Sequence, residues 1–179
     1  MIASLDQPKK KLNIPITIGF IALHMGALAA PFTLSWPAFW LFLFLYWLTM
    51  GVGIGLCYHR LLTHRSYKCP KWLEYFTTVC ACLASEGGPI SWVATHRYHH
   101  ITSDTEKDPH TPWHGFGFNW AHMFWFLYRS PIDQEKFRAK YAPDLIKDPG
   151  HQFLTKYNWV GQWILGGILL LIGGWPFVI

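Results

Sequence analysis

Residues 12–59 read LNIPITIGFIALHMGALAAPFTLSWPAFWLFLFLYWLTMGVGIGLCYH, and none of these 48 residues is Asp, Glu, Lys or Arg. A membrane-spanning helix needs about 20 apolar residues, so the stretch is long enough for two crossings. Ser35, Trp36 and Pro37 supply a turn near its middle. Because a bilayer offers backbone groups no water, both crossings must be helices. The stretch therefore predicts a transmembrane helical hairpin in residues 12–58.

A second uncharged stretch of 22 residues, 158–179, predicts a third span. Twelve of the 15 Lys and Arg residues and nine of the ten acids lie between residues 60 and 157. A soluble core helix is a poor alternative, because a 179-residue chain has too little other material to cover such stretches. We expect an all-α integral membrane protein with a tail at 1–11, the hairpin at 12–58, a polar region at 59–157 and the third span at 158–179.

The basic residues also predict the topology. Lysines 9–11 precede the first span, four basic residues follow the second within residues 60–71, and the turn between the spans carries none. By the positive-inside rule the tail and residues 59–157 are cytoplasmic. The net charge of +5 is thus explained by membrane topology and does not indicate a nucleic-acid partner. No signal peptide is evident, and the four cysteines are expected to be reduced thiols.

The polar region holds two histidine clusters. The first is YHRLLTHR at 58–65, with His59 and His64, and the second is THRYHH at 95–100, with His96, His99 and His100. At about 100° per residue, the second cluster projects from one face of a helix. His59 and His64 would lie about 140° apart on an ideal α-helix. They could serve two metals, or one metal if the helix ends or bends between them.

These clusters predict metal ligands. Neutral imidazoles at such density would be unusual as packing, and protonated ones would repel one another and the neighbouring arginines. A transition metal removes both objections, and an imidazole-rich site suits Fe, Zn, Cu or Ni. The HExxH pattern of metalloproteases is absent.

Two apolar stretches flank the second cluster. Residues 72–83 and 116–127 are each about a dozen residues long, too short to span a bilayer, and we expect interfacial or buried helices. The polar loop at 103–110 is rich in turn formers. Asp104, Asp108 and His110 from this loop are candidates to orient ligand imidazoles through their second nitrogen.

HRLLTHRSY at 59–67, HRYHH at 96–100 and DTEKDPH at 104–110 together resemble the membrane fatty acid desaturases of the Δ9 acyl-lipid and acyl-CoA (stearoyl-CoA) type. The two clusters, their separation, their position after a helical hairpin and the acidic loop all match. The resemblance covers nearly the whole chain.

The resemblance implies a non-haem di-iron centre at the cytoplasmic face. Such a centre uses O₂ and two electrons, from ferredoxin or a cytochrome b5, to introduce a cis double bond into a saturated acyl chain. By position in the motifs, the implied iron ligands are His59, His64, His96, His99 and His100.

The chain departs from the family pattern beyond these motifs. The family carries a third cluster, another HxxHH, after a fourth span, and the remaining histidines here form no such motif. Five of eight family histidines are present. We therefore expect a fragment that ends within its third apolar stretch and that, isolated, has no desaturase activity.

The substrate side resembles the bacterial branch of the family. Animal acyl-CoA members carry Arg-Asp directly before the second cluster, where this chain has Ala94 and Thr95. This favours a cyanobacterial-type enzyme acting on glycerolipid acyl chains over an acyl-CoA enzyme of the endoplasmic reticulum. An apolar tunnel must select one methylene pair. Trp92 is a candidate for its wall, and Arg129 is a candidate head-group contact.

Other functions use similar residues. A membrane hydroxylase or alkane monooxygenase has comparable histidine clusters, and a non-enzymatic metal-binding membrane protein is a further alternative. A metal transporter would place its ligands near the bilayer midplane, where this chain has only His24.

Overall fold

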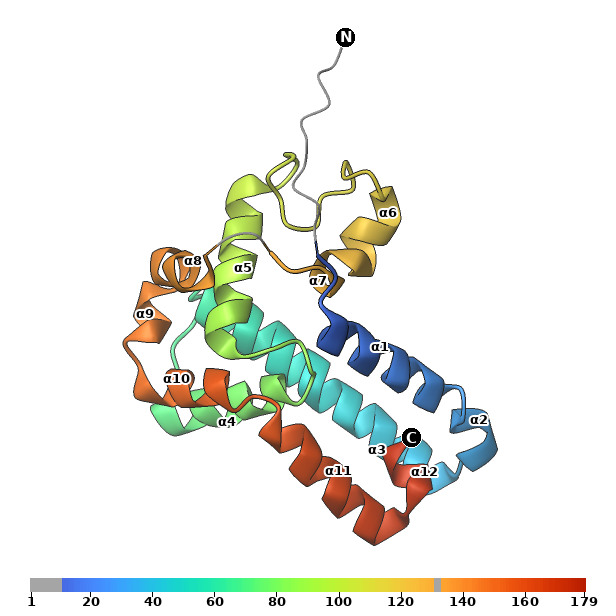
Figure 1. The fold of residues 1–179 in the computed structure, drawn as a ribbon. Coiled ribbons are helices and arrows are strands. Elements are labelled where there is room, and N and C mark those ends of the chain that lie inside the picture. Colours follow the sequence, from blue (N-terminus) through green and yellow to red (C-terminus); the bar gives the residue numbers. More distant parts are fainter. Residues whose placement is uncertain (1–10, 131–132) are drawn as a thin grey trace.

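The computed structural model describes residues 11–130 and 133–179, and these ranges contain helices and no strand, with one isolated bridge between Leu12 and Tyr128 (Figure 1). The helices are α1 (Ile14–Ala27), α2 (Ala30–Thr33), α3 (Trp36–Tyr46), η1 (Trp47–Thr63), α4 (Lys71–Cys82), α5 (Pro89–Thr102), α6 (Gly117–Asn119), η2 (Trp120–Phe124), α7 (Trp125–Leu127), α8 (Gln134–Tyr141), α9 (Pro143–Ile146), α10 (Pro149–Lys156), α11 (Val160–Gly173) and α12 (Trp175–Val178). The all-α prediction is confirmed for this part of the chain.

The longest helix is formed by α3 and η1, which follow one another without a break. It begins where the sequence predicts a turn: Ser35 Oγ accepts a hydrogen bond of 3.3 Å from the Ala38 N–H. It covers 28 residues, Trp36–Thr63, and by length and composition it is the one helix among the described residues that can cross a bilayer. Only 6% of its apolar window is buried. A core helix of a soluble domain would be mostly covered, so this helix needs an apolar surrounding.

The expected first and third spans correspond to shorter helices. The helices α1 and α11 have 14 residues each, about 21 Å at the α-helical rise, whereas the hydrocarbon core is about 30 Å thick. At Gly174, with a φ of 67°, the chain turns from α11 into α12. The short helix α12 then contacts α2 and α3 (Figure 1).

The buried core lies at the C-terminal end of the long helix Trp36–Thr63, next to the polar region. There the last turns of η1 pack against α4 and α5, and α9 packs against α5. The buried residues of this core are Cys57, Tyr58, Leu61, Leu62, Ala81, Cys82, Ile90, Val93, Ala94, Ala142 and Leu145. Tyr58 is fully buried, and its hydroxyl donates a 3.1 Å hydrogen bond to the Gly87 carbonyl. This contact holds the turn that precedes α5 against η1.

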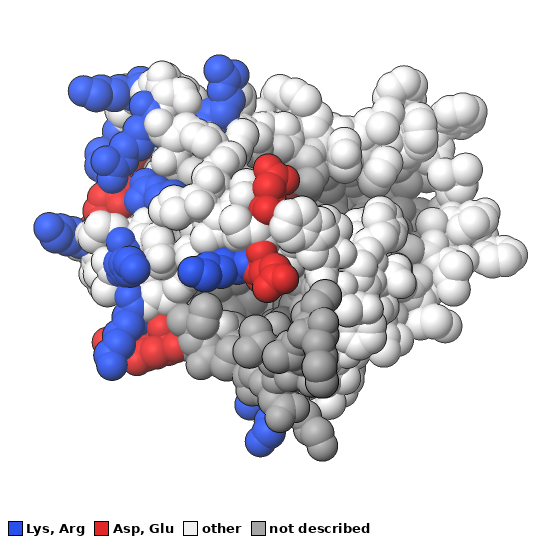
Figure 2. Space-filling model, turned by 90° about the horizontal axis from the view of Figure 1, so that it is seen from above, with Lys and Arg blue, Asp and Glu red and all other residues white. Residues whose placement is uncertain are grey.

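Charged residues share that end of the molecule. Figure 2 shows Lys and Arg gathered on one side of the face in view, whereas the opposite side is almost without charge. The charge pattern of the sequence therefore becomes a spatial separation between an apolar end and a polar end.

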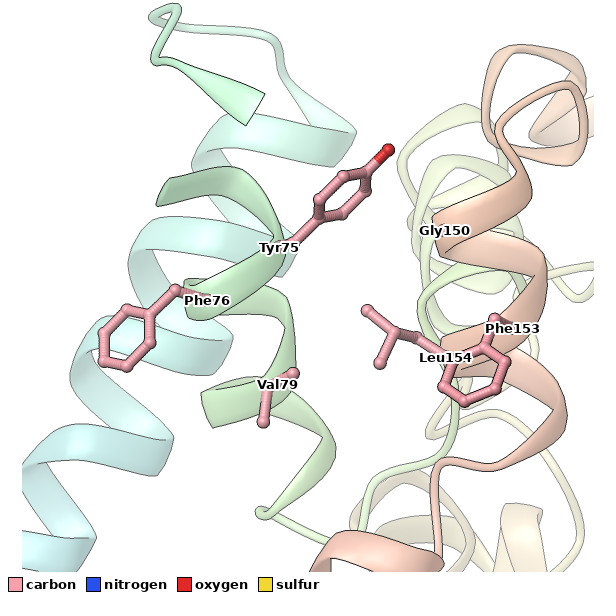
Figure 3. Close-up of a pocket in the computed structure, with 6 residues that line it drawn as sticks. All are labelled: Tyr75, Phe76, Val79, Gly150, Phe153 and Leu154. Atoms are coloured by element: carbon pink, nitrogen blue, oxygen red, sulfur yellow. The ribbon is translucent and has the colours of Figure 1, made fainter. Parts of the chain in front are cut away.

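A cavity of about 330 Å³ lies between α4 and α10 (Figure 3). It is lined by Tyr75, Phe76, Val79, Gly150, Phe153 and Leu154. No histidine lines it, and both histidine clusters lie elsewhere, on η1 and α5.

Candidate metal centre

The first histidine cluster lies in the last turn of η1. This segment is π-helical, and the His64 N–H donates to the His59 carbonyl at 3.1 Å, an i to i+5 bond. Residues five apart, which diverge on an α-helix, approach one another here. The Nε2 atoms of His59 and His64 lie 3.1 Å apart. The helix ends at Thr63, between these two residues, and its last π-helical turn brings them together.

The second cluster lies on α5. This helix begins at Pro89, and Gly88 precedes its first turn. His96 and His100 are one turn apart, and their Nε2 atoms lie 3.1 Å from each other. These two side chains therefore project from the same face of α5, as their spacing predicts.

The two pairs face each other. The rings of His59 and His96 are 4.9 Å apart between centroids, and those of His64 and His100 are 4.6 Å apart. One nitrogen from each of these four histidines can be chosen so that all four atoms lie within 4.8 Å of one another. Four of the five predicted ligands thus form one group.

The group is electrostatically suited to a cation. Burial, and then the neighbouring His100 and His59, lower the pKa of His96 to about 3. Burial and His64 also lower the pKa of His100. Both rings are neutral at pH 7, so their lone pairs are available to a metal without prior loss of a proton. A group of four imidazoles fits iron, zinc, copper or nickel.

His99 belongs to a second group. Its Nδ1 lies 3.0 Å from both carboxylate oxygens of Asp108, whose side chain is only 7% exposed. The centroids of the His110 and His99 rings lie 4.1 Å apart, and the backbone N–H of His110 donates to the Asp108 carboxylate at 3.2 Å. A carboxylate on one imidazole nitrogen fixes the ring and leaves Nε2 to face a metal. His99 is also 5.8 Å from the His96 ring, so the two groups are adjacent.

The structure places the other three candidate residues differently. Trp92 stacks on His96 with centroids 4.5 Å apart and an interplanar angle of 28°, and its Nε1–H donates to Glu86 at 2.8 Å. Asp104 lies in an exposed turn with a φ of 63°. Arg129 is exposed, and its backbone N–H donates to the Lys11 carbonyl at 2.8 Å. Among these three, Trp92 is the one that touches a histidine of the four-histidine group.

Sequence reasoning missed a third group: Glu74, Asp148 and His151 also lie within 4.8 Å of one another. Lys71 Nζ lies 2.7 Å from both carboxylates, so an ammonium ion already offsets part of their negative charge. Glu74 and Asp148 are 74 positions apart, and no spacing rule joins them. The group is an ion-pair network between α4 and α10.

Sequence reasoning also missed Arg97, which appears in the second cluster only as a charged neighbour of histidines. Its guanidinium contacts α9 and the end of η1. The one signal in the sequence is a charged residue placed between histidines that are predicted to be ligands.

Comparisons with known proteins show the family to which the chain is similar. Residues 34–179 match the family model for fatty acid desaturase. The chain is 49% identical over 173 residues to an sn-1 stearoyl-lipid 9-desaturase of Anabaena variabilis, and the match covers 96% of this chain and 62% of that protein.

Two further relatives cover similar shares. An sn-2 palmitoyl-lipid 9-desaturase of Nostoc sp. is 43% identical over 89% of this chain and 56% of its own length. Acyl-CoA 5-desaturase AL21 of Anemone leveillei is 45% identical over 88% of this chain and 48% of its own length. The chain thus spans about half to three fifths of the length of these relatives.

Proposed function

The chain belongs to the fatty acid desaturase family, and we propose that it forms the part of a Δ9 acyl-lipid desaturase that carries the first two histidine clusters. The observation that carries this proposal is the convergence of His59, His64, His96 and His100 from two helices onto one point. The reaction removes two hydrogens from adjacent methylenes of a saturated acyl chain. With O₂, two electrons and two protons, it forms a cis double bond and two waters.

We propose that the bound metal is a pair of iron ions. His59, His64, His96 and His100 would hold iron directly, and His99 would do so from its position beside Asp108. Iron would supply the O₂ chemistry that a C–H bond of a methylene requires. The chain itself provides the imidazoles, and Trp92 excludes water from one side of His96 by stacking on it.

We propose that Asp108 orients His99 and that His110 supports this pair. Their contacts, 3.0 Å from His99 Nδ1 to Asp108 and 4.1 Å between the two rings, support both roles. Asp104 and Arg129 remain weaker candidates for orienting a ligand and for contacting a head group, because both lie exposed.

We propose a glycerolipid acyl chain as the substrate. Two of the relatives described above are named stearoyl-lipid and palmitoyl-lipid desaturases. Another is named an acyl-CoA desaturase, so the family itself contains both acyl carriers. Ala94 and Thr95 precede the second cluster, where an Arg-Asp pair would favour CoA. The electron donor would be ferredoxin or a cytochrome b5.

We propose a multi-pass location in a bacterial membrane, with the metal centre at the cytoplasmic face. The long apolar helix Trp36–Thr63 and the exposed apolar side chains of α1 and α11 support membrane contact. Leu23 of α1 is 67% exposed and Leu171 of α11 is 88% exposed, and such side chains need lipid or protein against them. The basic residues beyond His59 support the cytoplasmic side.

The experiment is a complementation with a chimera. Residues 1–179 are joined to the part of the Anabaena variabilis relative that the match does not cover. The chimera is expressed with ferredoxin and fed deuterated stearate, and fatty acid methyl esters are analysed by mass spectrometry. We expect a new monounsaturated acid with its double bond at C9, and its loss in a His96→Ala variant.

The same assay is run on the isolated 179-residue chain. With five of the eight histidines that the family uses, we expect it to bind metal and to form no double bond. A folded chimera that yields hydroxylated stearate, or no product while binding iron, contradicts the desaturase proposal.

A further inference from the structure

Arg97 lies between His96 and His99 in the sequence, but its guanidinium contacts other parts of the chain. The side chain is 17% exposed, and all three of its nitrogens donate hydrogen bonds. Its acceptors are the backbone carbonyls of Leu62, Thr63 and Tyr141 and the carboxylate of Asp144. One side chain of α5 therefore reaches both the end of η1 and the segment formed by α8 and α9.

The contacts to η1 fall between the two ligands of the first cluster. Nη2 lies 2.6 Å from the Leu62 carbonyl and Nε lies 3.4 Å from the Thr63 carbonyl. Carbonyls in the last turn of a helix have no partner in the helix and carry its negative partial charge. The π-helical turn that brings His59 and His64 together therefore ends on a guanidinium that belongs to the helix of the second cluster.

The contact to Asp144 gives the guanidinium a fixed direction. Nη1 lies 2.7 Å from Oδ1 and Nη2 lies 3.1 Å from Oδ2, which is a two-pronged pairing, and Nη1 also donates to the Tyr141 carbonyl at 3.0 Å. Burial alone would raise the pKa of the Asp144 carboxyl, but the hydrogen bonds from Arg97 and Arg65 hold it well below its usual range. The anchor is thus anionic at any physiological pH.

We propose that Arg97 is a positioning residue of the metal centre: by joining the Leu62–Thr63 carbonyls to Asp144, it sets the separation between the first and second histidine clusters. This inference rests on the proposed metal-binding function of those clusters. The role needs arginine, because a planar fork of five N–H donors can bind a carboxylate and two carbonyls in different directions at once. A lysine ammonium is a single point and cannot reach both sides.

Cobalt binding by the full 179-residue chain in detergent micelles tests the proposal. Co²⁺ is titrated into the metal-free chain and its visible absorption is recorded, which reports both the affinity and the number of ligands. The variants are Arg97→Lys and Arg97→Gln. Loss of a group that positions ligands typically weakens metal binding by about 10–100-fold, and we expect this loss together with a changed Co²⁺ spectrum. Far-UV circular dichroism checks that helicity is retained.

Arg65→Gln is the matched control. Arg65 also binds Asp144, at 2.7 Å, but its side chain is 63% exposed. An exposed ion pair contributes little, so we expect the Co²⁺ affinity to change by less than about threefold.

If the Arg97 variants do not fold, a variant of its partner, Asp144, tests the same contact. Asp144→Asn leaves Arg97 and all histidines in place but removes the charge that aims the guanidinium, and we expect weaker Co²⁺ binding with an altered spectrum. Wild-type affinity and spectrum in Arg97→Lys, or in Asp144→Asn, would overturn the inference. Failure of the wild-type chain to bind Co²⁺ would instead overturn the proposed metal centre, and this inference with it.

Discussion

His59 and His64 illustrate how a small change of helix type decides a site. On an α-helix their side chains would point about 140° apart. In the π-helical turn their Nε2 atoms lie 3.1 Å apart, and the bond from the His64 N–H to the His59 carbonyl is the one that defines that turn. The sequence identified both residues and left open how they could act together. That answer depends on backbone hydrogen bonds and not on spacing.

Asp108 and Asp104 are two carboxylates in one loop that sequence reasoning could not tell apart. Asp108 is buried against His99, and Asp104 is exposed. We predict that Asp108→Asn, which retains the shape but removes the charge, weakens Co²⁺ binding by at least about tenfold, because His99 loses the group that fixes its orientation. Titration of the metal-free chain measures this.

Asp104→Asn is the control for that prediction, with an expected change below about threefold. If Asp104→Asn were the weaker binder, the assignment of Asp108 as the carboxylate that orients His99 would be wrong.

At the scale of the elements, η1 and α4 approach so closely that one glycine is required. A Cβ at Gly53 would lie 2.5 Å from the Ala81 nitrogen and 2.6 Å from its Cα, which are backbone atoms that cannot rotate away. We predict that Gly53→Ala destabilises the fold by about 1–3 kcal/mol, which lowers the thermal midpoint in micelles by several degrees.

Gly51→Ala is the matched control for this helix. A Cβ there meets only the Trp47 side chain, at 3.5 Å, an ordinary contact. Because alanine favours helix over glycine, we expect the midpoint to stay equal or rise. Equal midpoints for Gly53→Ala and the wild type would mean that η1 and α4 do not pack as described.

The helices α4 and α10 are joined by Asp148. Its carboxylate caps α10 by accepting from the Gly150 and His151 N–H groups, and it also binds Lys71 at 2.7 Å and Tyr75 at 2.9 Å, both on α4. Burial would raise the pKa of Asp148, but the hydrogen bond from Lys71, with those from His151 and Tyr75, lowers it to about 2 from an ordinary 3.8.

The sign of the pH effect follows from that direction. Since the folded-state pKa is below the unfolded one, the carboxylate stabilises the fold above about pH 4, and this contribution is lost as the pH falls toward about 2. We predict that the difference in thermal midpoint between the wild type and Asp148→Asn is largest near pH 6 and shrinks between pH 4 and 2. A difference that stays constant over this range would argue against the bridge from Asp148 to Lys71.

At the scale of the whole molecule, an apolar end and a polar end carrying the histidines are separated along one long helix. We predict that a cysteine at position 107 is labelled by a membrane-impermeant maleimide from the cytoplasmic side, and a cysteine at position 34 from the opposite side. Leu34 is 70% exposed in the turn before α3. Cys57, Cys80 and Cys82 are buried, so Cys69→Ser is a sufficient background. Labelling of both positions from one side would contradict the proposed topology.

The sequence by itself determined the helical class, the apolar stretches, the two histidine clusters and the family. These properties are local: they depend on uninterrupted apolar runs, on turn residues such as Ser35 and Pro37, and on spacing within one helix. The tertiary structure alone decided which histidines meet, that His99 pairs with Asp108, and that Arg97 joins Leu62 to Asp144. Such contacts join residues up to 47 positions apart around Arg97 and 77 positions apart between α4 and α10. The physical reason is that a buried charged group needs a hydrogen-bonding or oppositely charged partner. The packing of distant helices supplies that partner, and the periodicity of the sequence does not predict which residue it is.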